Sequence, residues 1–261
     1  MILTSKTAIV TGSTSGIGLG IARALAAEGA HVMLNGFGEA AAIERIRQEI
    51  AAIGPGKVGY HPADMSKPAE IADLVTKTAA TLGSVDVVVN NAGIQHVAPV
   101  EACPVERWDA IIAINLSSSF RTIRAALPLM KKAGWGRIIN IASTHGLVAS
   151  GEKTAYVAAK HGVIGLTKAV AIECANTGVT CNAICPGWVL TPLVQKQIEA
   201  RAAEQKISVD QARNTLLGEK QPQLQFTTPE QLAAMAVFLC SPAAANMQGA
   251  QLVSDGGWTA Q

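Results

Sequence analysis

The chain has 261 residues, of which 49% are hydrophobic and 15% charged, and its net charge at pH 7 is +2. This composition excludes a disordered chain, and so small a charge argues against a nucleic-acid or membrane-surface partner. The apolar runs are too short to cross a bilayer and the N-terminus lacks the pattern of a signal peptide, so we expect a cytoplasmic protein. Five scattered cysteines predict buried thiols rather than disulfides or a zinc site.

A short strand ending at Val10 runs into a glycine-rich turn, T-G-S-T-S-G-I-G, and then into an Ala- and Leu-rich helix. In this context glycines indicate a site for dinucleotide phosphates. Gly12 permits the tight turn, Gly16 lets the backbone approach a pyrophosphate, and Gly18 lets the helix pack against its strand. The spacing G-x-x-x-G-x-G differs from the more familiar G-x-G-x-x-G.

The second predicted strand ends in N-G-F-G, where dinucleotide-binding folds recognise the adenosine ribose. NAD is usually held there by an acidic residue, and NADP by Arg or Lys. This segment has neither, and without a cation a 2′-phosphate would be uncompensated, so NAD is favoured by elimination. Phe37 could pack against the adenosine end. Asp64, after the third strand, is either a partner of the adenine amino group or a capping or loop acid.

The run V-D-V-V-V predicts a strand covered on both faces, and it ends in N-N-A-G at Asn90–Gly93, a place where α/β folds bind ligands. A long helix is expected over 106–132, interrupted near Pro128. It carries Asn115 in the apolar stretch I-I-A-I-N-L, where an amide needs partners. Asn115 is therefore either structural or connected to the site.

Tyr156 and Lys160 lie four residues apart near the start of a predicted helix at 154–174, so the phenol and the ammonium share one face. A neighbouring cation favours the phenolate, and a fall in phenol pKa of roughly two to three pH units corresponds to about 3–4 kcal/mol. A tyrosine tuned in this way is a plausible general base. Taken alone the pair is a weak signal. The strand predicted at 137–142 delivers Ser143 to the same region.

The region 192–225 is polar, and we interpret it as one or two surface helices that form a lid over the site. Strands and helices alternate along the whole of 1–261 without a linker. This predicts a single doubly wound α/β domain of about seven parallel strands with helices on both faces. Strands are expected at 7–10, 31–34, 57–60, 85–89, 137–142, 179–184 and 251–253, and other helices at 17–28, 39–53, 68–82 and 229–239.

Several polar side chains fall in segments that should face a substrate. They are Gln95, His145, Lys153 and Gln197. Together they would form a cationic, donor-rich patch suited to a small carboxylate. Trp188 and Trp258 could close the other side and leave room for little more than a methyl group. Each of these residues also has an ordinary interpretation as a solvated or core side chain.

The chain closely resembles the short-chain dehydrogenase/reductase family over essentially its whole length. The motifs that carry the resemblance, in this order and spacing, are Gly12-Gly16-Gly18, N-N-A-G, Asn115, Ser143, Tyr156 and Lys160. The resemblance implies that Tyr156 is the acid/base and that Ser143 hydrogen-bonds the reacting oxygen. It implies that Lys160 lowers the Tyr156 pKa and holds the nicotinamide ribose, with Asn115 anchoring a water relay to Lys160.

The resemblance also implies a nicotinamide dinucleotide and a set of residues around it. This cofactor set is Gly12, Ser15, Gly16, Ile17, Gly18, Phe37, Asp64, Met65, Asn91, Gly93, Tyr156, Lys160, Pro186, Gly187, Val189 and Thr191. The segments G-I-Q-H, S-T-H-G-L-V-A-S, E-K-Q-P and D-G-G-W-T resemble bacterial members that act on short 3-hydroxy acids. That resemblance implies NAD, a homotetramer, and a substrate set of Gln95, Ser143, His145, Lys153, Tyr156, Trp188, Gln197 and Trp258.

Two alternatives remain open. One is another enzyme on the same scaffold, acting on a sugar, a steroid or a 3-ketoacyl thioester; Lys153 and Trp258 discriminate, because those substrates are bulky or lack a nearby carboxylate. The other is a non-catalytic protein that senses dinucleotides. Ser143, Tyr156 and Lys160 argue against it, since a binder needs no proton acceptor.

Overall fold

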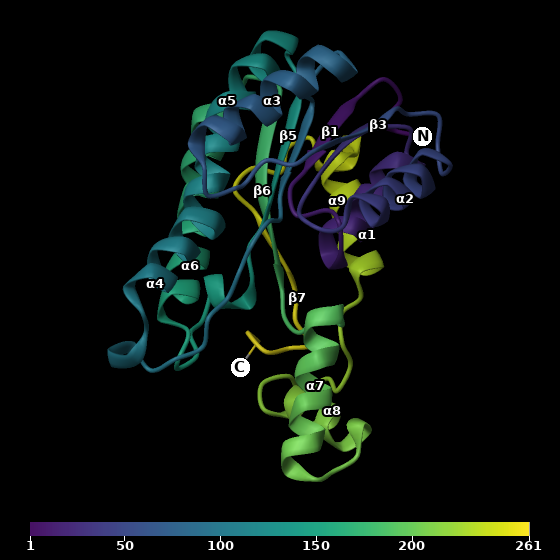
Figure 1. Cartoon of the computed structure of the whole chain (residues 1–261). Coiled ribbons are helices and arrows are strands. Elements are labelled where there is room, and N and C mark those ends of the chain that lie inside the picture. Colours follow the sequence, from purple (N-terminus) through teal and green to yellow (C-terminus); the bar gives the residue numbers. More distant parts are fainter. Residues whose placement is uncertain (261) are drawn as a thin grey trace.

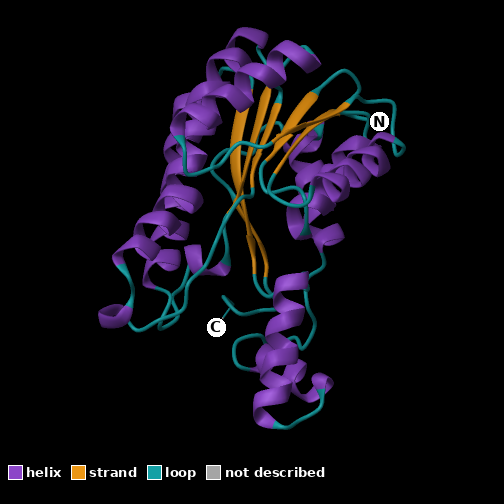
Figure 2. Cartoon of the chain, viewed as in Figure 1, coloured by secondary structure: helices purple, strands orange, loops and turns teal. Residues whose placement is uncertain are grey.

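A computed structural model describes residues 1–260, except for the side chain of Leu193. Its centre is one parallel sheet (Figures 1 and 2). The strand order is β3 (Val58–His61), β2 (His31–Asn35), β1 (Thr7–Val10), β4 (Val87–Asn90), β5 (Gly136–Ile141), β6 (Val179–Pro186) and β7 (Gln251–Ser254). All these strands are parallel, but β2 and β3 are added on one side of β1 and β4 to β7 on the other, so the order of the strands reverses between β1 and β4. α/β folds bind ligands beyond the carboxyl ends of the strands at such a point.

Helices form a layer on each face of the sheet (Figure 1). One layer contains α1 (Gly16–Ala27), α2 (Ala40–Ala51) and α9 (Pro229–Cys240), and the other contains α3 (Pro68–Leu82), α4 (Val105–Ile112), α5 (Ser118–Ala133) and α6 (Thr154–Cys174). Successive residues of β1 serve the two layers, since Ala8 and Val10 pack towards α1 while Ile9 packs towards α3. Burial on both faces explains the continuous apolar strands. The predicted fold class is confirmed.

The long helix predicted at 106–132 is interrupted at a different place from the one expected. A π-helical turn at Ala113–Ser117 separates α4 from α5, whereas Pro128 lies inside α5. The expected break at Pro128 was therefore wrong. The π turn contains Asn115, whose amide donates to the Ile94 carbonyl and accepts from the Ile94 N–H, both at 2.9 Å. Such turns inside helices frequently occur at functional sites.

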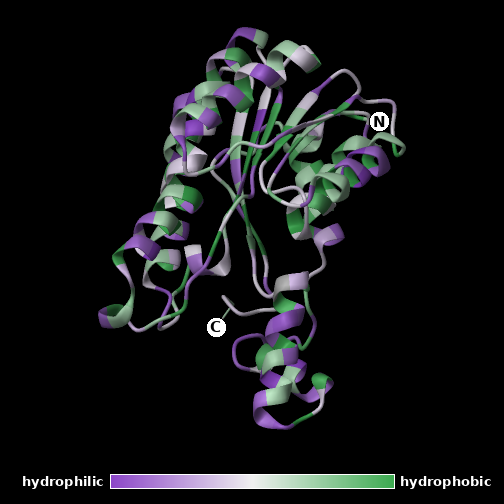
Figure 3. Cartoon of the chain, in the orientation of Figure 1, coloured by the Kyte–Doolittle hydropathy of each residue, from purple (hydrophilic) through white to green (hydrophobic). Residues whose placement is uncertain are grey.

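Two further helices, α7 (Pro192–Gln205) and α8 (Val209–Gly218), extend from the carboxyl edge of the sheet (Figure 1). They form a small apolar cluster of their own around Ile198 and Leu217, and many of their other residues are hydrophilic (Figure 3). Residues 192–225 thus contain two surface helices, as predicted. Within residues 1–260, no helix has both the length and the apolar character needed to cross a membrane.

Candidate active site

Two adjoining cavities lie at the carboxyl edge of the sheet. The glycine-loop cavity, about 440 Å³, is bounded by the turn after β1, the end of β2 and the loop after β3. The tyrosine cavity, about 260 Å³, lies over the ends of β5 and β6 and contains Tyr156 and Lys160. Both cavities have lining residues in common, namely Ile17, Asn91, Gly93, Ile94 and Thr191. A long ligand can therefore occupy both.

The glycine loop is shaped by backbone conformations that L side chains rarely adopt. Gly12 and Gly16 have φ angles of +63° and +55°. A Cβ on Gly18 would overlap the Gly12 carbonyl oxygen and lie 2.5 Å from Asn91 Nδ2, so Gly18 permits the close packing predicted for it. Neither a capping side chain from Ser15 nor an acidic residue occupies the start of α1. Its positive end is suited to phosphate.

The N-N-A-G segment is fastened to this loop. Asn91 Nδ2 donates to the carbonyl oxygens of Thr11 and Gly12, at 2.9 and 3.0 Å. The Thr11 hydroxyl in turn accepts from the backbone N–H groups of Asn91 and Ala92. These bonds hold the carboxyl end of β4 against the turn after β1, which sets the passage between the two cavities.

The far end of the glycine-loop cavity has few charges. Phe37 is 69% exposed there. Asp64 accepts hydrogen bonds from the backbone N–H and the hydroxyl of Ser66, which lower its pKa. Asp64 therefore acts as a loop acid, one of its two predicted roles, while also lining the cavity. Among the described residues lining this cavity, Asp64 alone carries a charge.

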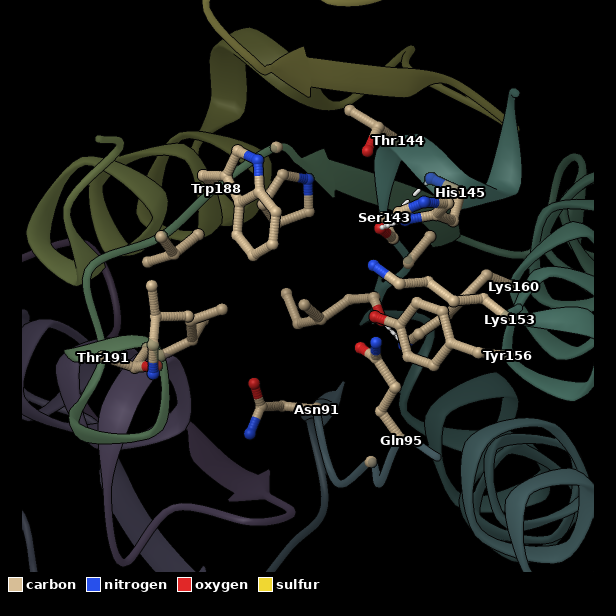
Figure 4. A pocket seen from close by; sticks show the side chains of 18 of the residues that line it. Asn91, Gln95, Ser143, Thr144, His145, Lys153, Tyr156, Lys160, Trp188 and Thr191 are labelled. Atoms are coloured by element: carbon tan, nitrogen blue, oxygen red, sulfur yellow. Dashed lines mark hydrogen bonds between the residues drawn. The ribbon is translucent and has the colours of Figure 1, made fainter. Parts of the chain in front are cut away.

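Tyr156, Lys160 and Ser143 meet in the tyrosine cavity (Figure 4). Lys160 is almost fully buried, and its Nζ donates to the Ile141 carbonyl at 2.7 Å and lies 5.6 Å from the centre of the Tyr156 ring. Burial lowers the Lys160 pKa to about 8. Burial also raises the pKa of the Tyr156 phenol, against a smaller opposing effect of its hydrogen bond with Ser143. The expected lowering of the phenol pKa was wrong for this arrangement, because desolvation outweighs the other effects.

A second group of side chains lines the same cavity. The rings of Trp188 and Trp258 stack with their centres 6.4 Å apart, and Lys153 Nζ lies 5.5 Å from the centre of the Trp188 ring. His145 packs edge-on against Trp258 at 5.1 Å, and its Nε2 lies 2.9 Å from the Ser150 hydroxyl. Burial, followed by repulsion from Lys153, lowers the His145 pKa to about 4. His145 is thus neutral at pH 7, and Lys153 carries the positive charge of the predicted patch.

Most of the predicted site residues line one of the two cavities. Those that do are Gly12, Ser15, Gly16, Ile17, Phe37, Asp64, Met65, Asn91, Gly93, Gln95, Ser143, His145, Lys153, Tyr156, Lys160, Pro186, Gly187, Trp188, Val189, Thr191 and Trp258. Gly18 lies behind the glycine loop, and Asn115 is buried and bonded to Ile94. Gln197 is exposed on α7 and lines neither cavity.

Some residues that line the cavities were not among the predicted site residues. Thr14, Asn35 and Gly36 line the glycine-loop cavity, and Thr144 and Val194 line the tyrosine cavity. The buried Asn35 amide donates to the carbonyls of His61 and Ala63, which ties β2 to the end of β3. The position of Asn35 in N-G-F-G, at the end of the second predicted strand, could have identified it as a lining residue.

Comparison with known proteins identifies full-length relatives. Residues 12–259 match a family model described as enoyl-(acyl carrier protein) reductase. The chain is 63% identical over 261 residues to a D-beta-hydroxybutyrate dehydrogenase of Cupriavidus necator, with all of both chains covered. It is 57% identical to one of Rhizobium meliloti, covering 98% of this chain and 100% of the relative. A crystal structure of an actinorhodin polyketide ketoreductase with NADPH matches with a TM-score of 0.90 at 35% identity, covering 99% of this chain and 98% of that one.

Proposed function

Because the chain belongs to the short-chain dehydrogenase/reductase family of nicotinamide-dependent oxidoreductases, we propose that it oxidises D-3-hydroxybutyrate to acetoacetate with NAD. The observation that carries the proposal is the tyrosine cavity. It combines a phenol, a serine hydroxyl and a buried ammonium with Lys153, and two stacked tryptophans restrict its size. The two relatives called D-beta-hydroxybutyrate dehydrogenase cover 100% and 98% of this chain, which supports the proposal.

The residues present fit a bound dinucleotide. The glycine loop and the open end of α1 suit the pyrophosphate, and the shared lining between the cavities gives a continuous path to Tyr156. When bound, the nicotinamide supplies the carbon that accepts hydride. We assign Lys160 to the nicotinamide ribose, and Pro186, Gly187 and Thr191 to the carboxamide.

In the proposed mechanism Tyr156 removes the proton of the substrate hydroxyl while the carbinol carbon loses hydride. Ser143 donates a hydrogen bond to the same oxygen and stabilises its developing charge. Burial alone disfavours the charged phenolate, and we assign Lys160, the ammonium in the same cavity, to offset that cost when Tyr156 accepts the proton. Asn115 holds the loop at Ile94, which lines the cavity. We assign Asn115 to anchoring a water relay that carries the proton towards Lys160.

We assign the substrate carboxylate to Lys153, with Gln95 and neutral His145 as donors. Lys153 is partly buried, so its interaction with a carboxylate is less screened than at an open surface. Gln197 joins this set only if α7 and α8 move towards the cavity, which is the proposed lid role of 192–225. The methyl end of the substrate then faces the tryptophans.

The preference for NAD is supported by the far end of the glycine-loop cavity. The described residues lining it include no Lys or Arg that would compensate a 2′-phosphate, and the one charged group, Asp64, would repel it. Phe37 offers an apolar surface for the adenosine. The NADPH in the ketoreductase structure belongs to that relative.

We further propose a homotetramer. Two surfaces carry exposed apolar side chains that would be covered by symmetric contacts: Val105 and Phe120 on α4 and α5, and Phe238 and Val253 on α9 and β7. Light scattering during gel filtration should give about four times the chain mass of 27.0 kDa. A cytoplasmic location stays a prediction of the sequence.

The decisive assay supplies NAD or NADP together with D- or L-3-hydroxybutyrate, a sugar alcohol, a hydroxysteroid or a 3-hydroxyacyl thioester. The absorbance of the reduced nicotinamide is followed. We expect turnover with D-3-hydroxybutyrate and NAD, at least tenfold above every other pair. Faster turnover of a bulky substrate would favour another enzyme of the family, and binding of NAD without turnover of any substrate would favour a sensor.

A further inference from the structure

Trp188 and Trp258 form one wall of the tyrosine cavity, and each stands on a loop. Trp188 lies across the cavity from Tyr156 (Figure 4). Trp188 follows the end of β6 at Pro186, and Trp258 follows the end of β7 at Ser254. Pairing between Pro186 and Ser254 holds the strand ends together, but it stops before either tryptophan. Contacts beyond the strand pairing therefore contribute to the gap between the two rings.

The buried amide of Gln221 lies between these two loops. Its side chain is at the segment that leaves α8 and is only 2% exposed. Gln221 Oε1 accepts from the Trp188 backbone N–H at 2.8 Å. Gln221 Nε2 donates to the carbonyl oxygens of Gln223 and Gln225, at 3.4 and 3.2 Å. A buried amide is costly unless it is hydrogen-bonded in this way.

The missing side chains of two glycines make room for that amide. A Cβ on Gly187 would lie 2.7 Å from Gln221 Oε1, and one on Gly256 would lie 2.8 Å from Gln221 Nε2. Gly187 immediately precedes Trp188, and Gly256 lies two residues before Trp258. Gln223 also donates from its backbone N–H to the Gly256 carbonyl at 3.0 Å. One amide group thus contacts both tryptophan loops and the segment leaving α8.

We infer that Gln221 is a positioning residue that sets the spacing of the Trp188–Trp258 wall and thereby restricts the length of substrate that the cavity accepts. The inference rests on the proposed function, because it assumes that the short end of a hydroxy acid faces this wall. Gln221 touches no reacting atom. It acts by holding the Trp188 backbone, whose carbonyl is held in turn by the Thr227 N–H at 3.0 Å.

The test uses Gln221→Met, which keeps the length of the side chain and removes its hydrogen bonds. The measured quantity is the ratio of kcat/KM for 3-hydroxybutyrate to kcat/KM for 3-hydroxypentanoate, which is one methylene longer. We expect this ratio to fall about tenfold, the range in which one methylene is discriminated by a fitted pocket. The KM for NAD should stay unchanged. Loss of folded enzyme alone lowers both rates equally and leaves the ratio unaltered.

Gln223→Ala is the matched control, because its exposed side chain donates to the Gln225 side chain, while its bond with Gln221 is made by its backbone carbonyl, which the substitution keeps. It should keep the wild-type ratio. Gln221→Glu is a second variant that retains the acceptor for the Trp188 N–H, but its ionised carboxylate can donate to neither the Gln223 nor the Gln225 carbonyl, and its ratio should also fall. The inference would be overturned if a folded Gln221 variant kept the wild-type ratio and differed from the wild type only in a lower Tm. Gln221 would then be purely structural.

The two hypotheses fail in different ways. Lack of 3-hydroxybutyrate oxidation by the unaltered protein would contradict the proposed function. In that case the measured quantity is the ratio of kcat/KM for propan-2-ol to kcat/KM for butan-2-ol, which is one methylene longer. A fall of this ratio in the Gln221 variants would still support the positioning role.

Discussion

The two cavities are built by different means. The glycine-loop cavity is formed largely by backbone: positive φ angles at Gly12 and Gly16, the start of α1 and the ends of adjacent strands. The tyrosine cavity is formed largely by side chains from segments far apart in the sequence, such as Gln95, Lys153 and Trp258. The backbone geometry of the first cavity is visible in the sequence as a short glycine motif. The side chains that line the second cavity are scattered along the sequence without a fixed spacing.

The supports of the two cavities also differ. The glycine loop packs on the main core through α1 and β1. The wall beside Trp188 rests on α7 and α8, which have a small separate apolar cluster that includes Ile198 and Leu217. Segments with few core contacts open most readily. We therefore expect substitutions in the tyrosine cavity to alter the use of the hydroxy acid, and those in the glycine-loop cavity to alter the use of the dinucleotide.

Lys153→Ala is expected to show the largest difference between the roles of the two cavities. A charge-assisted bond to a substrate carboxylate contributes about 1.5–3 kcal/mol, so the KM for 3-hydroxybutyrate should rise roughly 10- to 100-fold. The KM for NAD should be unchanged, and so should the KM for butan-2-ol, which has no carboxylate. Lys132→Ala, at an exposed lysine of α5, is the control. An equal rise for butan-2-ol would contradict the carboxylate assignment.

The dinucleotide end is tested by Phe37→Arg. An arginine at this exposed position adds a cation to the glycine-loop cavity. Among the described residues that line this cavity, Asp64 is the only charged one. We expect kcat/KM for NADP to rise about tenfold, by a charge-assisted bond to the 2′-phosphate, with little change in the KM for the hydroxy acid. If NADP use does not improve, the 2′-phosphate does not lie near Phe37.

His145 predicts a pH effect on stability. Its pKa falls from 6.5 to about 4 on folding, mainly through burial. Between these values the unfolded chain takes up a proton that folded His145 does not, so acid favours unfolding across this window. Wild-type protein should lose up to about 3 kcal/mol more unfolding free energy between pH 7 and pH 4 than His145→Gln, because one pH unit corresponds to 1.36 kcal/mol. Urea titrations at both pH values measure the difference; parallel losses would show that His145 is not buried neutral.

The smallest effect is expected from Gln197→Ala. Gln197 is exposed on α7 and reaches the substrate only if α7 moves. We expect a rise in the KM for 3-hydroxybutyrate of about threefold, in keeping with one neutral hydrogen bond made at the cost of closure. Glu199→Ala, another exposed residue of α7, serves as the comparison. Identical KM values for both variants would mean that Gln197 stays at the surface.

Much of the fold could be predicted because its signals are local. The helix α6 begins and ends as predicted, at Thr154 and Cys174, since no proline or glycine pair interrupts its apolar pattern. The π turn around Asn115 could not be located, because it depends on a partner at Ile94. Pro128, the local signal that was followed instead, is tolerated inside α5.

The candidate site was predictable to a similar degree. Residues identified by motif, such as Gly16 and Tyr156, line the two cavities, and their roles stay predictions. The direction of the Tyr156 pKa could not be predicted, because burial and the hydrogen bond of Lys160 to Ile141 are tertiary properties. Gln221 was also missed as a site residue, since a glutamine in a polar segment gives no sign that it will be buried.

The central claim, that the Tyr156 phenol oxygen takes the substrate proton, is tested most directly by Tyr156→Phe. The change removes one hydroxyl and keeps the ring that lines the cavity. The account predicts that kcat with D-3-hydroxybutyrate falls at least about 1,000-fold, while the Kd for NAD, measured by fluorescence titration, stays within about twofold. A variant that binds NAD normally and retains more than about a tenth of the wild-type kcat would contradict it.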